Sequence, residues 1–151
     1  MTKRRNLEYR IFKQKTYIEE ELKKIFITLK APKILKDVMR YSVLNGGKRI
    51  RPFLLAEVSK IYNVKPSVFK YPCMAVEIIH SFSLVYDDLP CMDDDKLRRG
   101  KPTVHIAFNE ANALLGGSSL LIYAFELLSY DKFKVNNDIK VNLIHKLSKA
   151  I

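Results

Sequence analysis

The stretch that decides the fold is residues 80–105, HSFSLVYDDLPCMDDDKLRRGKPTVH. It begins as an apolar helical sequence, passes through five aspartates, and ends in the bases Lys96, Arg98, Arg99 and Lys101. Carboxylates supply the oxygen ligands that Mg²⁺ prefers, while lysine and arginine bind phosphate oxygens. The order of these residues therefore predicts a site for a diphosphate and Mg²⁺ at the end of a helix.

The position of the acids favours a functional site over a purely structural loop. Asp87 and Asp88 fall near the end of a predicted helix, where the helix dipole is negative, and Asp93, Asp94 and Asp95 follow closely. Each unfavourable placement costs a few tenths to about 1 kcal/mol. Acidic residues at the negative end of a helix contradict the usual charge preference, and such a departure often marks a functional site. The alternative is a solvated acidic loop that is paired with the bases after it.

Length and composition predict one globular domain, residues 1–151, because the chain is long enough for one core and 48% of it is hydrophobic. The net charge of +11 is compatible with nucleic acid, an anionic membrane surface or an anionic small substrate. Lysine is spread over nearly every predicted helix, so we interpret most of the charge as solvated helix faces and expect no nucleic-acid partner. The basic run Lys3–Arg5 keeps a nucleic-acid or membrane-surface protein open as an alternative.

Cysteine usage and hydropathy predict a cytoplasmic protein. Cys73 and Cys91 form neither a disulfide framework nor a metal-binding pair. No apolar run reaches the ~20 residues that cross a bilayer, and the N-terminal residues lack the apolar core of a signal peptide. We therefore expect no transmembrane segment.

Apolar residues recur at helical spacings along the whole chain, and no strand pattern is present, so the sequence predicts an all-α antiparallel helix bundle. Pro72 is expected to open the helix that leads to the aspartates, after a connection over 63–71. Gly116 and Gly117 are expected to separate two later helices, and Asp138 is expected to cap the last one. The predicted helices are 7–29, 33–44, 52–62, 72–89, 104–115, 118–130 and 138–147.

A second segment suited to phosphate is GGKRIRP, residues 46–52. Its glycines allow a ligand to approach the backbone, and Pro52 suits the start of a helix. Three cations, Lys48, Arg49 and Arg51, then converge on a helix N-terminus, which attracts anions. The other interpretation is a basic turn that only aids solubility. His80 lies in a helix that is apolar on nearly every side, where a histidine is more often a hydrogen-bonded core residue than a ligand.

Taken together, these segments resemble the trans-isoprenyl diphosphate synthases, most closely the bacterial-type farnesyl and geranylgeranyl diphosphate synthases. The resemblance runs from about residue 35 to residue 128 and is carried by residues 46–52, His80, residues 87–105 and the AFELL sequence at 124–128. It implies a helix bundle of the isoprenoid synthase type. It also implies a head-to-tail condensation of isopentenyl diphosphate with an allylic diphosphate, with Mg²⁺ as cofactor.

The resemblance assigns roles to residues of both segments. It implies that Asp87 and Asp93 bind Mg²⁺, with Asp88 beside them in the catalytic group. It implies that the allylic diphosphate contacts Arg98 and that the diphosphate of isopentenyl diphosphate contacts Lys48, Arg51, His80 and Arg99.

Product length is expected to depend on Phe82, which lies five residues before Asp87, about 7.5 Å along the helix axis. In the resembled family the floor of the hydrocarbon tunnel lies on this helix. A large aromatic side chain there, together with the additional Leu89-Pro90 in the aspartate motif, favours a farnesyl product. An ordinary core phenylalanine is the other interpretation.

The sequence departs from the family pattern in two respects. Ser118 stands where the family usually has an aspartate, and family members are about twice as long, with a second aspartate-rich motif in the additional part. We therefore expect this chain to be the N-terminal half of a synthase domain, inactive in isolation and dependent on a complementing C-terminal half or a homodimer. The alternative is a non-catalytic interaction subunit or a remnant of a synthase.

Overall fold

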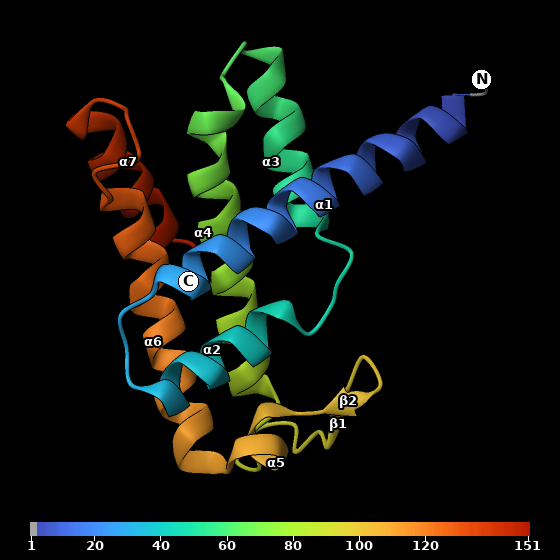
Figure 1. Cartoon of the computed structure of the whole chain (residues 1–151), viewed down its shortest axis with the longest axis vertical. Helices are drawn as coiled ribbons and strands as arrows, with labels where there is room; N and C mark the ends of the chain where they lie inside the picture. The colour runs from blue at the N-terminus through green and yellow to red at the C-terminus, as the bar shows by residue number, and fades with distance from the viewer. Residues whose placement is uncertain (1–2) are drawn as a thin grey trace.

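The central element of the fold is α4 (Pro66–Asp87), which contacts α1, α2, α3 and α6. The computed structural model describes residues 3–151, with side chains from Asn6 onward, so the Lys3–Arg5 side chains of the basic run lie outside the described part. The remaining helices are α1 (Lys3–Thr28), α2 (Lys33–Leu44), α3 (Ile50–Ile61), α5 (Val104–Phe108), α6 (Glu110–Ser129) and α7 (Asn137–Ser148). Figure 1 shows α1 crossing the bundle in front of α3 and α4. The all-α prediction is confirmed.

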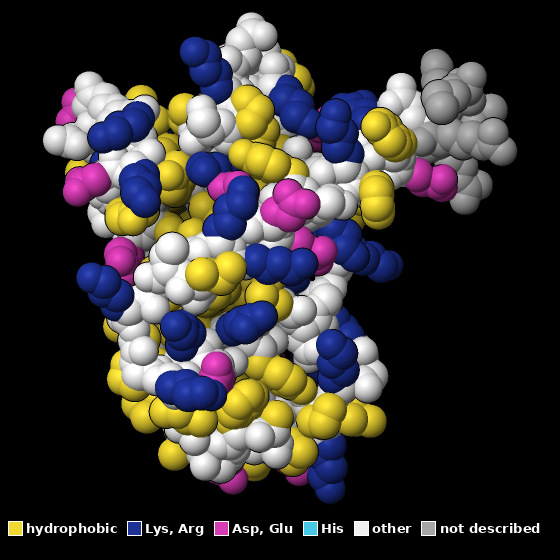
Figure 2. Space-filling model, in the orientation of Figure 1, with side chains coloured by type: hydrophobic (Ala, Val, Ile, Leu, Met, Phe, Trp, Pro, Cys, Tyr) yellow, Lys and Arg dark blue, Asp and Glu magenta, His cyan; other side chains and the backbone are white. Residues whose placement is uncertain are grey.

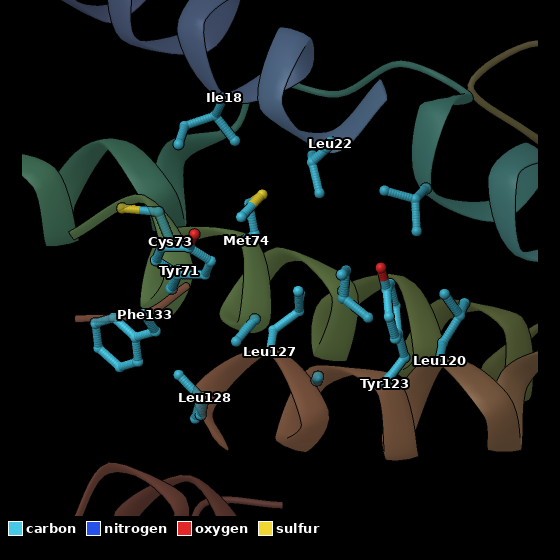
Figure 3. Close-up of a cluster of buried hydrophobic side chains, with 14 of the residues drawn as sticks. Ile18, Leu22, Tyr71, Cys73, Met74, Leu120, Tyr123, Leu127, Leu128 and Phe133 are labelled. Atoms are coloured by element: carbon cyan, nitrogen blue, oxygen red, sulfur yellow. The ribbon is translucent and has the colours of Figure 1, made fainter. Parts of the chain in front are cut away.

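The main core lies between α1, α4 and α6. Figure 3 shows side chains of α4 between those of α1 on one side and those of α6 on the other. Leu22, Met74 and Leu120 from these three helices are at most 1% exposed. Burying each such side chain contributes about 1.5–3 kcal/mol relative to exposure, so this contact positions the aspartate-bearing end of α4.

The start of α4 differs from the prediction, because the helix begins at Pro66 and continues through Pro72. Pro66 occupies the first turn, where a missing backbone N–H is not needed. Pro72 removes one helical hydrogen bond at a cost of about 3 kcal/mol or more. Its neighbours Tyr71, Cys73 and Met74 are buried in the core, and this burial outweighs the local cost.

The expected break at Gly116-Gly117 is also wrong, because both glycines lie inside α6. They are points of close approach: a Cβ on Gly116 would lie 2.2 Å from Cγ1 of Val38, and one on Gly117 would lie 2.5 Å from Cε2 of Tyr86. The glycines therefore let α6 approach α2 and α4 closely. The break falls instead at Asn109, with φ 77°, whose side chain accepts a 2.9 Å hydrogen bond from the Asn112 N–H.

Two other helix starts lie near their predicted positions with different residues at the cap. α3 begins at Ile50, two residues before Pro52, and is preceded by Arg49 with φ 53°. The cap of α7 is Asn136, whose side chain accepts a hydrogen bond from the N–H of Asp138, the residue predicted to be the cap.

A two-stranded hairpin was not predicted. Strands β1 (Leu97–Arg98) and β2 (Lys101–Pro102) pair antiparallel across the turn residues Arg99 and Gly100. The turn residues have φ 55° and 76°, and a two-residue hairpin of type I′ requires positive φ at both positions. Strands of two residues are too short to produce the alternating pattern by which sequence reveals a sheet.

By length and composition, two of the described helices, α4 and α6, are apolar enough to cross a membrane. Core helices of soluble proteins meet the same criterion. About half of the most apolar window is buried within the fold in each: 50% in α4 and 44% in α6. The absence of a transmembrane segment and the cytoplasmic location stay predictions. On the face shown in Figure 2, lysine and arginine are scattered over several elements and do not form one block.

The close approach of α6 to α2 generates a stability prediction. Gly116→Ala should destabilise the chain by about 1–2 kcal/mol, because overpacking against Val38 outweighs the roughly 1 kcal/mol that alanine adds to helix propensity. Urea unfolding measures the change. In a Val38→Ala background the same substitution should become neutral or stabilising; an equal penalty in both backgrounds would show that Val38 is not the cause.

Candidate active site

The acidic loop, residues 87–95, folds back onto the end of α4. The Asp93 N–H donates a 2.9 Å hydrogen bond to the Asp87 carbonyl oxygen, and the Asp94 N–H donates a 3.1 Å bond to the Leu89 carbonyl. The last carbonyls of a helix have no partner within it, so a returning loop that offers N–H groups is favoured there. This contact joins the backbones of Asp87 and Asp93, the two predicted Mg²⁺ ligands. Asp87 is half-buried, whereas Asp93 is exposed.

Asp88 is engaged by an arginine. Its side chain is buried, and both of its oxygens accept hydrogen bonds from Arg98 Nε, at 2.7 and 2.9 Å. A further bond of 2.5 Å joins Arg98 Nη2 to Asp88 Oδ1. The hydrogen bond to Asp88 is the largest cause of a raised Arg98 pKa. Asp88 therefore orients Arg98 in this structure, and Arg98 remains about 29% exposed and accessible to a ligand.

The β1–β2 hairpin connects the acidic loop to residues 46–52, which we call the glycine segment. Arg98, the last residue of β1, reaches Asp88, while Arg99 in the turn donates to the carbonyl oxygen of Gly46. Gly47 has φ 135°, and a Cβ there would lie 2.8 Å from Arg99 Nη1. Glycine is needed at this position both for its backbone angle and for the approach of the guanidinium group.

A basic cavity of about 540 Å³ lies where this segment meets α4. Its cationic and titratable lining includes Lys48, Arg51, His80 and Arg99, the four residues predicted to contact one diphosphate. They come from the glycine segment, the start of α3, the middle of α4 and the hairpin turn. The structure therefore gathers on one cavity four side chains from three stretches that are far apart in sequence.

Arg49 lines the basic cavity together with Lys48 and Arg51, as expected, but it is paired with acids inside the fold. Its side chain is 1% exposed and points inward, where Nη1 donates to Glu77 Oε1 at 2.7 Å. Nη2 donates to the Val43 carbonyl at 2.7 Å, and Nε donates to Glu19 at 3.3 Å. A buried arginine needs such partners, because an unpaired charge is very costly there. Arg49 therefore anchors the glycine segment to α4 through its pair with Glu77.

Burial lowers the pKa of His80, and the neighbouring Arg51 and Arg99 lower it further, against an opposing effect of Glu77. The pKa of Arg99 is lowered by burial first and then by Arg49. These directions show that cations are crowded around the cavity. An anion placed among them would relieve the repulsion and raise the pKa of His80.

Phe82 lies on α4 beside this basic cavity. It lines a neighbouring cavity of about 360 Å³ that also contacts Arg51 and His80. Its ring packs on Tyr86, with 4.8 Å between ring centroids. The Tyr86 hydroxyl is 2.7 Å from the Ser118 hydroxyl, so the serine that departs from the family pattern has a hydrogen-bonding partner.

The donors at the end of α4 fit Mg²⁺. Among the residues that the structure describes, no three histidine, cysteine or acidic side chains already form a metal-binding group. Asp87 and Asp93 supply two carboxylates, and Mg²⁺ commonly takes one or two protein carboxylates and completes its shell with water and phosphate oxygens. The residues present are therefore of the type and number that a Mg²⁺–diphosphate site needs.

The residues that sequence reasoning missed are the supporting ones, chiefly the Arg49–Glu77 pair. One signal was available: Glu77 is a charge inside a helix that is otherwise apolar on nearly every side, which indicates a buried partner. Nothing in the sequence identifies Arg49, with Lys48 and Arg51 on either side of it, as that partner.

Comparison with known proteins identifies the family. Residues 32–151 match the family model described as Polyprenyl synthetase. The chain is 42% identical over 146 residues to the farnesyl diphosphate synthase of Geobacillus stearothermophilus, which covers 96% of this chain and 49% of that protein. The chain thus spans about half the length of the curated relatives it matches.

Solved structures show the same fold. A geranyltransferase from Legionella pneumophila superposes with a TM-score of 0.91 at 33% identity, covering 95% of this chain and 51% of that one. An FPP/GFPP synthase from Zymomonas mobilis gives 0.82 at 40% identity, covering 93% and 53%. The expected helix bundle of the isoprenoid synthase type is confirmed.

Proposed function

The chain belongs to the polyprenyl synthetase family, and we propose that it binds isopentenyl diphosphate and an allylic diphosphate for their head-to-tail condensation. The observation that carries this proposal is the basic cavity, on which Lys48, Arg51, His80 and Arg99 meet. A diphosphate presents several charged acceptors close together, and a cavity lined by guanidinium, ammonium and imidazole groups complements them.

Each part of the site has a role in the proposed reaction. The C1–O bond of the allylic diphosphate breaks, the double bond of isopentenyl diphosphate forms a new carbon–carbon bond to C1, and a proton leaves. The basic cavity holds isopentenyl diphosphate by its diphosphate. Arg98, oriented by Asp88, contacts the allylic diphosphate beside the acidic loop. The Asp87 and Asp93 carboxylates would hold Mg²⁺, which would neutralise charge as it develops on the departing diphosphate.

The proposed condensation also needs a complementing polypeptide. Exposed apolar side chains form a stripe along α3 at spacings of three and four residues: Ile50, Leu54, Val58 and Ile61. Such a stripe is suited to packing against another helix. We infer that these 151 residues form the N-terminal half of a synthase domain, and that turnover requires a complementing C-terminal half, in cis or in trans, within a homodimer or with a separate subunit. A non-catalytic interaction subunit would bind the same partner and show no turnover with it.

Farnesyl diphosphate is the proposed product. The observation that favours it is the position of Phe82, whose ring lines the cavity next to the basic one and is packed against Tyr86. A growing prenyl chain would meet these rings, and packed aromatic side chains do not readily make room for additional methylenes.

Metal-dependent stabilisation tests the site assignment. In the presence of inorganic pyrophosphate, adding Mg²⁺ at a saturating concentration should raise the melting temperature of the chain by a further ~3–10 °C, because a ligand that binds the native state stabilises it. Asp87→Ala should abolish the Mg²⁺-dependent part and retain the part due to pyrophosphate alone. Asp131→Ala, which changes an exposed acid elsewhere, is the matched control. An equal Mg²⁺ increment in Asp87→Ala would contradict the assignment.

Product length tests the role of Phe82. With a complementing half that supports turnover, Phe82→Ala should shift the products from fifteen carbons toward twenty or more, measured by chromatography of the dephosphorylated prenols. Phe125→Ala serves as a control, because Phe125 is a half-buried phenylalanine of α6 outside this cavity. A folded, active Phe82→Ala protein that still stops at fifteen carbons would show that Phe82 does not limit the chain.

A further inference from the structure

A second cavity, of about 490 Å³, lies between α1, the end of α3 and the start of α4. We call it the α1 cavity; its lining includes Tyr9, Arg10, Lys13, Gln14, Tyr17, Lys60 and Phe69. It shares no lining residue with the basic cavity. On α3, Arg51 lines the basic cavity and Lys60 lines the α1 cavity. These two residues are nine positions apart, which corresponds to about 13 Å along a helix. The α1 cavity is therefore a separate site.

Gln14 supplies a buried hydrogen-bond donor without an acceptor. Its side chain is 6% exposed, and its Oε1 accepts a 3.5 Å hydrogen bond from Lys60 Nζ. Its Nε2 has no hydrogen-bonding partner among the described residues. A buried polar group left unpaired costs about 1–3 kcal/mol. An oxygen atom of a ligand in the α1 cavity would satisfy it.

The charges around Gln14 favour an anion. Arg10 and Lys60 share a single acid, Glu57, with 2.7 Å between Lys60 Nζ and Glu57 Oε1. Lys13 also lines the cavity and has no ion pair among the described residues, so the lining carries three cations and no acid. Burial lowers the pKa of Lys60, and Arg10 lowers it further, consistent with an excess of positive charge. A negatively charged group would reduce this repulsion.

The remaining walls are aromatic. Phe69 is 2% exposed, Tyr17 is half-buried with its hydroxyl donating to the Pro66 carbonyl at 3.3 Å, and Tyr9 lies at the rim. Small-molecule sites typically have volumes of about 300–1,000 Å³, with apolar walls and a few polar groups that orient the ligand. The α1 cavity has this composition and size.

We propose that the α1 cavity binds an amphiphilic organic anion, a phosphate or carboxylate carried on an apolar body. The anionic oxygens accept hydrogen bonds from Gln14 Nε2 and from Lys13 or Lys60, and the apolar body lies against Tyr17 and Phe69. This site is independent of the proposed condensation, because none of its residues lines the basic cavity or belongs to the acidic loop.

Residue-resolved NMR on the full 151-residue chain tests the proposal, with phenyl phosphate and benzoate as probes. Each probe should shift the Gln14 side-chain NH₂ resonances. The probe that binds with the higher affinity identifies the preferred head group. Lys13→Glu should weaken binding by about tenfold, whereas Lys23→Glu, the same charge change at an exposed position of α1, should leave it unchanged. Gln14→Met removes the donor at similar volume and should also weaken binding.

Three results would overturn the proposal. The first is the absence of a Gln14 shift with both probes. The second is inorganic phosphate binding as tightly as phenyl phosphate, which would show a cationic patch without a role for the aromatic walls. The third is equal weakening by Lys13→Glu and Lys23→Glu, which would show a general charge effect. If Gln14→Met does not fold, the pair of lysine variants still decides the question.

Discussion

The buried ion pair between Arg49 and Glu77 is the interaction on which the candidate site depends. With side chains 1% and 3% exposed, the two groups lie at 2.7 Å and have almost no contact with water. Removing one partner of such a pair typically costs 3–5 kcal/mol, because the other charge is left buried and unpaired. Arg49 has φ 53° directly before α3, so its inward side chain fixes the course of the glycine segment. That course presents Lys48 and Arg51, on either side of it, to the basic cavity.

A second anchor is the hairpin, which joins the two chemically distinct parts of the site. Arg98 pairs with Asp88 at the end of α4, and Arg99 contacts the backbone of Gly46. Two adjacent residues, Arg98 and Arg99, therefore hold the acidic loop and the glycine segment in a fixed position relative to each other. This arrangement fits the order of acids and bases in residues 87–99: Asp88 orients Arg98, and in the proposed function Asp87 and Asp93 would hold a metal while the bases would contact phosphate.

The sequence was sufficient for the fold class and for the residues that line the basic cavity, and insufficient for the supporting contacts. Helical periodicity identifies α2 with its observed bounds. The resemblance to the synthase family, and not spacing alone, singled out Lys48, Arg51, His80 and Arg99, because the residues by themselves favoured a core role for His80. The expectations that glycine pairs end helices and that proline starts them failed where tertiary packing determines the helix bounds. Gly116 and Gly117 suggest a break but permit close helix contact, and Pro72 suggests a helix start but lies in a buried helix. Arg49 resembled its neighbours in sequence, and only the position of Glu77 on α4 distinguishes it.

The most direct test of this account is the affinity of Glu77→Gln for inorganic pyrophosphate, measured by calorimetry on protein shown to be folded. Glu77 lines the basic cavity as an acid, so a purely electrostatic effect of its removal would strengthen the binding of an anion. The account predicts the opposite, a loss of about tenfold or more, because Arg49 loses its partner and the glycine segment no longer holds Lys48 and Arg51 in place. Unchanged or tighter binding by the folded variant would contradict it.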